Sequence, residues 1–96
     1  MKQVWKFLVP VDDQPHEIDM PAMSVARHVD LLPQSDAPDV VALWVEVFPP
    51  TLPLSGTRRF QVYATGQPIP DYATYVGTVV HRTHPLVWHL FEIPFP

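Results

Sequence analysis

The 96-residue sequence has no cysteine, only three glycines, and six lysines and arginines together. Without cysteine there is no disulfide framework, no thiolate nucleophile and no cysteine-ligated zinc, and the expected compartment is a reducing cytoplasm. The few glycines form no glycine-rich phosphate-binding loop. Ten acidic residues give a net charge of −4, which disfavours general binding to the nucleic-acid backbone.

Long hydrophobic runs are also missing. The longest nearly apolar stretch, residues 40–48, contains Glu46 and is far shorter than the ~20 residues of a membrane helix. Pro10 ends the first apolar segment after Val9, so the N-terminus does not resemble a signal peptide. We therefore expect a cytoplasmic protein that does not span a membrane, folded as a single domain over residues 1–96 with an apolar content of 47%.

Proline, by contrast, is abundant, with 13 residues spread along the chain. Proline breaks helices and removes a backbone donor, so it is tolerated mainly at the ends of elements. The segments between the prolines are short and rich in Val, Trp, Phe, Tyr and Thr, which favours strands. The sequence therefore predicts an all-β fold, a single small antiparallel barrel or sandwich of about six to eight strands.

The expected strands cover residues 2–9, 16–20, 24–32, 39–48, 57–64, 74–82 and 86–93. Residues 39–48 are the most hydrophobic and predict a central strand covered on both faces, with Trp44 buried. In residues 2–9, Trp5, Phe7 and Val9 share the face expected to contact the core. The last two strands resemble a hairpin, and residues 49–56 and 66–73 are expected loops.

Residues 24–32 allow two interpretations. Alternation places Val25, Val29 and Leu31 on one face with Arg27 among them. A helix over residues 23–32, capped by Ser24, is the alternative, but the β-branched valines and the flanking prolines favour a strand.

Residues 57–69 contain the densest chemistry. In an alternating strand Phe60, Val62 and Ala64 form an apolar face, and Arg59, Gln61 and Tyr63 form a polar one. Arg59 and Tyr63 then offer a cation and a stacking surface for an anionic, nucleotide-like ligand. The alternative is that Arg59 is simply an exposed charge on a sheet. Arg58 points to the opposite face, where packing or an ion pair is expected.

Three further residues are candidates for ligand binding. Arg27 interrupts a valine face, which indicates a buried ion pair, a binding site or an edge residue with its charge in solvent. Arg82 and His84 lie in the segment His81-Arg82-Thr83-His84. Two histidines three residues apart occur in zinc sites, but a site needs three or four ligands, so no metal is predicted and ordinary polar histidines are the simpler interpretation.

Enzyme motifs are missing as well. None of the three serines, at positions 24, 35 and 55, lies in a Gly-x-Ser-x-Gly motif, and no His-Glu-x-x-His occurs. Carboxylates from distant segments are the remaining catalytic possibility. We expect a protein that binds rather than catalyses, without a cofactor.

Several motifs carry a resemblance that spans nearly the whole chain. They are Val-Trp-Lys-Phe at the start, Arg58-Arg59-Phe60, Thr65-Gly66-Gln67-Pro68-Ile69, Tyr75-Val76-Gly77-Thr78 and His89-Leu90-Phe91-Glu92. The sequence is similar to a family of small uncharacterised proteins of bacteriophages and bacterial genomes, known as a domain of unknown function. The resemblance implies a phage or prophage setting. Many members have histidine where this chain has Gln67.

Two functional hypotheses follow. The first is a phage-type protein that sequesters a small anionic ligand, such as a nucleotide of host defence signalling. The second is a module for self-assembly or for binding a host protein, because eight Trp and Phe residues are many for so short a chain. Both are compatible with a homo-oligomer.

Overall fold

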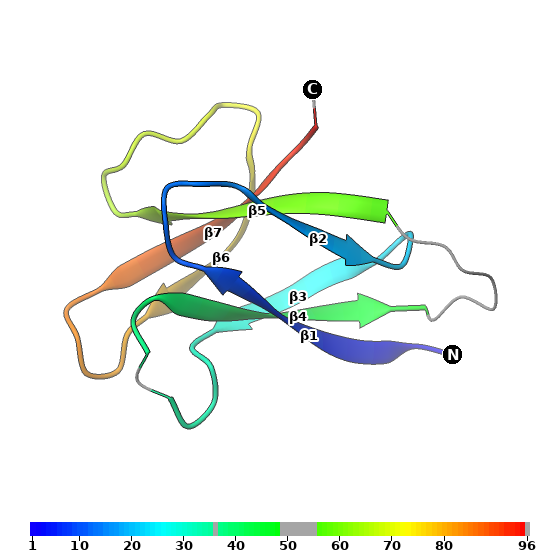
Figure 1. Cartoon of the computed structure of the whole chain (residues 1–96), viewed down its shortest axis with the longest axis horizontal. Coiled ribbons are helices and arrows are strands. Elements are labelled where there is room, and N and C mark those ends of the chain that lie inside the picture. The colour runs from blue at the N-terminus through cyan, green and yellow to red at the C-terminus, as the bar shows by residue number, and fades with distance from the viewer. Residues whose placement is uncertain (36, 49–55, 96) are drawn as a thin grey trace.

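The computed structural model describes residues 1–35, 37–48 and 56–95. All regular elements in these ranges are strands, and the chain forms two sheets (Figure 1). In chain order they are β1 (Gln3–Pro10), β2 (His16–Met20), β3 (Val25–Asp30), β4 (Val40–Val47), β5 (Gly56–Ala64), β6 (Thr74–Val80) and β7 (Val87–Ile93). The described part of the chain contains no helix that could cross a membrane.

The two sheets form a small antiparallel sandwich rather than a closed barrel. One sheet has the order β1-β4-β3 and the other β2-β5-β7-β6. At one side the edge strands β3 and β6 approach closely, because Gly77 of β6 faces Val29 of β3. The predicted all-β class is confirmed, and the seven strands of the described residues fall within the expected number.

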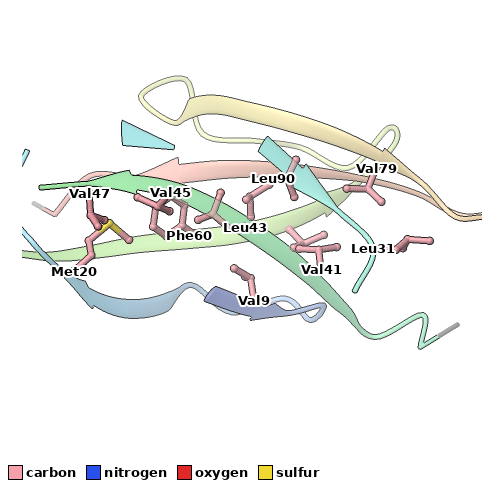
Figure 2. Packing of buried hydrophobic residues seen from close by; sticks show 12 residues of the cluster. Val9, Met20, Leu31, Val41, Leu43, Val45, Val47, Phe60, Val79 and Leu90 are labelled. Carbon is pink, nitrogen blue, oxygen red and sulfur yellow. The ribbon is translucent and has the colours of Figure 1, made fainter. Parts of the chain in front are cut away.

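The core lies between the sheets (Figure 2). Every second residue of β4 points inward from one sheet, and Phe60 and Leu90 point inward from the other. Such a face forms because successive side chains of a strand alternate. The largest fully buried side chains are Val9, Met20, Val41, Leu43, Val45, Val47, Phe60 and Leu90.

The central position of β4 is confirmed, but burial on both faces is not. β4 lies between β1 and β3, and its inward residues are fully buried. On the outward face Ala42 is fully buried, but Trp44 and Glu46 are only partly buried, and Phe48 just beyond the strand is 45% exposed. The reason is that the second sheet covers only the inner face of β4. On the outer face, the Trp44 ring contacts the His28 ring of the neighbouring strand, with 5.8 Å between the ring centroids.

Because β1 lies at the edge of its sheet, the expectation that Trp5, Phe7 and Val9 all contact the core is only partly correct. Val9 is buried and Phe7 partly buried, as predicted for the core-facing side. Trp5 belongs to the same side, but it is 37% exposed. β1 is the outermost strand of its sheet, so the Trp5 ring reaches solvent beyond the core.

β3 is a strand, which excludes the helical alternative for this segment, but its alternation is broken. The pairing with β4 shifts between Ala26 and His28, so Arg27 is the extra residue of a β-bulge. The bulge leaves Val25 at 37% exposed and turns Ala26 toward the core. The predicted common face of Val25 and Val29 is therefore wrong.

The C-terminal strands form the predicted hairpin. β6 and β7 are antiparallel neighbours, and the backbone N–H of His81 donates to the carbonyl of Leu86 at 2.9 Å. The predicted loop before them turns at Gly66, whose φ of +88° favours glycine. Of the expected loop over residues 49–56, positions 49–55 lie outside the described residues.

Candidate functional site

Arg59 lies on the outward face of the four-stranded sheet, in the middle of β5. β5 is paired on both sides, with β2 and with β7, which holds its backbone in a fixed position. Directly across the strands, Arg59 has Glu17 on β2 and Ile93 on β7. The strand period of two that buries Phe60 therefore turns Arg59 away from the core.

The guanidinium of Arg59 is held by the C-terminal segment that follows β7. Its Nη2 donates a hydrogen bond to the carbonyl oxygen of Pro94 at 2.6 Å. The Phe95 ring lies against the guanidinium, with 4.6 Å between Cζ and the ring centroid. Such stacking orients the planar cation.

Arg59 has no carboxylate within ion-pair distance among the described residues. Glu17 is its direct neighbour across the strands, but the guanidinium turns toward Pro94 and Phe95 instead. The Nε atom is buried and has no hydrogen-bond partner within the described ranges. Because Nε is buried, it does not reach a ligand in the groove; the Nη atoms, of which only Nη2 has a partner among the described residues, are the donors suited to an anion from outside the chain.

A groove of about 440 Å³ opens at this cation. Among the described residues, its walls are formed by Arg59, Tyr72, Pro94 and Phe95. Tyr72 and Phe95 are 65% and 48% exposed, so both aromatic rings are accessible from solvent. The volume lies within the range of roughly 300–1,000 Å³ that is usual for small-molecule sites.

Tyr63 lies on the same face as Arg59, but the expectation that it offers an open stacking surface needs correction. It is only 4% exposed, and its ring meets Phe91 edge-on at 5.7 Å between centroids. Burial raises the pKa of its hydroxyl, and Tyr72 adds a smaller contribution in the same direction. Tyr63 therefore packs beneath the surface of the outward face, and the rings accessible to a ligand are those of Tyr72 and Phe95.

Arg58 points to the opposite face, as the alternation predicts. Its Nε and Nη2 donate to the two carboxylate oxygens of Glu92 at 2.7 and 2.6 Å, and its Nη1 donates to the carbonyl of Ser24 at 2.6 Å. The hydrogen-bonded carboxylate raises the pKa of the Arg58 guanidinium further. This two-pronged ion pair satisfies the charge within the protein, so Arg58 has a structural role.

Arg27 lies in the other sheet, away from this groove. The bulge turns it to the outward face of β3, where its Nη2 lies 3.0 Å from Oε2 of Glu46. That hydrogen bond lowers the pKa of the Glu46 carboxyl. The buried ion pair considered for Arg27 is not observed: Arg27 is an exposed residue on an edge strand, and its ion pair with Glu46 lies at the surface.

Arg82 and His84 belong to the connection between β6 and β7. Nη2 of Arg82 donates to the carbonyl of Ser35 at 3.0 Å, which ties this connection to the turn after β3. His84 meets His81 edge-on, with 4.5 Å between ring centroids, and its backbone N–H donates to Nδ1 of His81 at 3.1 Å. Of the five predicted ligand residues, the structure thus brings Arg59 and Tyr63 together on one face.

Apart from the pair His81 and His84, the described histidines lie apart from one another. His89 lies on the outward face of β7, with its ring nitrogens 2.8 Å from Oγ1 of Thr65 and 2.9 Å from Oγ1 of Thr78. Over residues 1–35, 37–48 and 56–95, no group of three or more His, Cys, Asp or Glu side chains could hold a metal ion.

Comparison with known proteins gives a family for the chain. Residues 1–95 match the family described as a domain of unknown function, DUF7352. The chain belongs to this family. No curated protein and no solved structure matches it. The DUF7352 assignment confirms the resemblance to an uncharacterised domain family.

The groove of this DUF7352 domain includes residues that sequence reasoning missed. Tyr72 lies in the loop before β6, and Pro94 and Phe95 follow β7. The strand pattern contains no signal for them because all three lie outside the strands. One local signal was available in Phe95, an aromatic residue between two prolines, because such a segment does not fit the interior of a sheet.

Proposed function

We propose that this DUF7352 domain binds a small anionic ligand of nucleotide type in the groove at Arg59, without catalysing a reaction. The observation that carries this proposal is the environment of the guanidinium. It is oriented by Pro94 and Phe95, faces a groove of about 440 Å³, and has no carboxylate partner among the described residues.

The chemistry of the walls favours a ligand with two different parts. A phosphate or carboxylate suits the planar fork of Arg59, which can form two parallel hydrogen bonds to such a group. A flat ring suits the exposed faces of Tyr72 and Phe95, because stacking on aromatic side chains tolerates many ring systems. A nucleotide combines both parts in one molecule.

The biological setting is part of the same proposal. The resemblance to phage and prophage proteins supports a role in which the domain sequesters a signalling nucleotide of host defence in the host cytoplasm. Sequestration requires only tight binding, and the groove supplies a cation and two rings for it.

The ligand can be identified by capture from a nucleotide extract of host cells. The purified domain is incubated with the extract, freed of unbound material and denatured, and the released molecules are identified by mass spectrometry. We expect an anionic molecule with a ring. The release of nothing, or of uncharged molecules alone, would contradict the proposal.

The site itself is tested by titrating the captured ligand into Arg59→Ala in a calorimeter. We expect at least a tenfold loss of affinity with little change in melting temperature, since the substitution removes a charge-assisted hydrogen bond outside the core. Arg27→Ala is the matched control, because it removes the same charge from the other sheet. Equal losses in both variants would place the site elsewhere.

A second variant tests the sign of the charge. Glu17 is the direct neighbour of Arg59 across β2 and β5, so its carboxylate repels an anion in the groove. We expect Glu17→Gln to tighten binding of an anionic ligand and to do so most at low salt. An unchanged or weaker affinity would show that the anionic group lies away from Arg59.

A further inference from the structure

The geometry points to a second functional surface, in the other sheet. We propose that the free edge of β1 pairs with β1 of a second copy, so that two three-stranded sheets join into a continuous six-stranded sheet. This inference is independent of the groove at Arg59, which lies on β5 in the opposite sheet.

β1 is the long uncovered edge of the sandwich. β3 and β6 lie against each other, and β2 has five residues. β1 has eight residues, pairs with β4 without a bulge, and has no second strand partner among the described residues. Figure 1 shows its N-terminal half at the rim of the molecule. Long regular edges are templates for another strand.

One hydrogen bond shows which backbone N–H and C=O groups of β1 point to the free edge. The N–H of Val11 donates to the carbonyl of Asp39 at 2.8 Å, directly after the pair Pro10 and Val40. Hydrogen-bonded and non-hydrogen-bonded pairs alternate along an antiparallel ladder. The odd-numbered residues of β1 therefore bond to β4, and the N–H and C=O groups of Val4, Lys6 and Leu8 point to the free edge. Pro10 fits this assignment, since its missing N–H falls at the edge.

The side chains at this edge are apolar on both faces. Val4 and Leu8 are 63% and 48% exposed on the outward face. Trp5 is 37% exposed on the core-facing side, next to Phe7 at 6.5 Å between ring centroids. A second β1 would cover these surfaces, because residues opposite each other in a ladder share a face.

The sequence of β1 selects one register for a twofold pairing. Centring the pair on Lys6 places Lys6 opposite Lys6 of the second copy, and centring it on Val4 places Lys2 opposite Lys6, so both juxtapose like charges. Centring it on Phe7 places Pro10 where a donor is required. Centring it on Trp5 avoids both faults.

In the register centred on Trp5, the outward backbone groups of Val4 meet those of Lys6 of the second copy. The two Trp5 residues then form a non-hydrogen-bonded pair, in which the Cα atoms are about 4.5 Å apart and the side chains lie closest. Phe7 lies beside each Trp5, so four rings gather at the twofold axis. Aromatic cross-strand pairs are among the stabilising ones. The occupant of this edge is therefore a second copy of the chain.

The mass of the full chain in solution is the first test. By light scattering or sedimentation at micromolar concentration, we expect a particle of twice the 11.0 kDa chain mass. A monomer under these conditions would overturn the proposal and leave the edge to a strand of another protein.

Substitutions at Lys6 separate backbone pairing from side-chain chemistry. Lys6→Pro removes an N–H at the free edge but none that bonds to β4, so we expect a folded chain and a dimer Kd raised by about tenfold or more. Lys6→Gln keeps the N–H and removes the charge, and we expect it to remain dimeric. A dimer unaffected by Lys6→Pro would contradict pairing through β1.

The register can be tested by disulfide cross-linking, because the chain contains no cysteine and an introduced one is the only thiol. Trp5→Cys places two thiols opposite each other, and under mild oxidation we expect a disulfide-linked dimer. Val4→Cys is the control, since it faces Lys6 of the second copy and should not cross-link. This experiment also decides the matter if Lys6→Pro fails to fold. Cross-linking of Val4→Cys at the same rate as Trp5→Cys would refute the register.

Discussion

At the scale of single residues, Tyr63 combines an ionisable hydroxyl with an almost fully buried ring. Burial raises the pKa of this hydroxyl above its ordinary value of 10.0. The folded protein therefore retains the phenol proton at pH values where the unfolded chain releases it. The stability from this group is complete below about pH 10 and is lost as the pH rises toward the folded pKa.

We expect Tyr63→Phe to reduce this alkaline loss of stability, since phenylalanine has no proton to release. The free energy of unfolding, measured with urea in steps above and below pH 10, gives the comparison. If both proteins lose stability equally over that range, the hydroxyl of Tyr63 ionises as readily in the folded state as in the unfolded chain.

The sequence predicted the contrast between Arg58 and Arg59 because the contrast depends only on strand alternation. It did not predict that Tyr63 is buried. That burial depends on Phe91 of β7 and on the loop with Tyr72, which are distant in sequence. In general, local periodicity predicts which face of a strand a side chain lies on. How deeply the side chain is buried depends on other segments that cover that face, and local sequence patterns do not reveal those contacts.

At the scale of the element, the inward and outward faces of the strands differ in burial. Phe60 of β5 is fully buried, and Trp44 of β4 is only partly buried on an outward face. We expect Phe60→Ala to cost ~3–5 kcal/mol, the range for a buried aromatic, and Trp44→Ala to cost less, about 2 kcal/mol. Urea unfolding of both variants measures the difference. A larger cost at Trp44 would mean that another layer covers the outward face of β4.

Strand positions were predicted to within two residues at each end, because prolines and turn residues mark them. The course of β3 was not, because the break that Arg27 makes in the hydrophobic face was interpreted as an ion pair, a binding site or an edge residue and not as a bulge. The bulge is defined by the pairing with β4, so it arises from the sheet rather than from the strand alone.

At the scale of the whole molecule, the two sheets meet where Gly77 of β6 faces Val29 of β3. A Cβ at Gly77 would overlap Cγ1 of Val29, whereas a Cβ at Gly56 meets nothing within 4 Å. We expect Gly77→Ala to destabilise the fold by about 1–3 kcal/mol, as overpacking usually does, and Gly56→Ala to change stability little.

A double-mutant cycle with Val29→Ala shows whether this contact is the cause. Removing the Val29 methyl groups makes room for the new Cβ, so we expect the double variant to be more stable than additivity predicts. Additive losses would indicate that Gly77 is required for a reason other than contact with β3.

The groove at Arg59 also belongs to the molecular scale. It is built from the middle of β5, the loop before β6 and the segment after β7. The sequence indicated the cation, since an arginine on the polar face of a strand is visible in the pattern. The accessible rings, Tyr72 and Phe95, lie outside the strands, and their position beside Arg59 depends on the strand order.

That strand order also governs how the chain reaches its fold in time. β1 pairs with β4 and β2 with β5, so in each case two intervening strands are synthesised before the partner exists. The early hairpins available to a growing chain are β3 with β4 and β6 with β7. Folds dominated by such distant pairings close slowly, typically in milliseconds to seconds. β1, which carries the exposed edge with Trp5, therefore has no partner within its own chain until β4 has been synthesised.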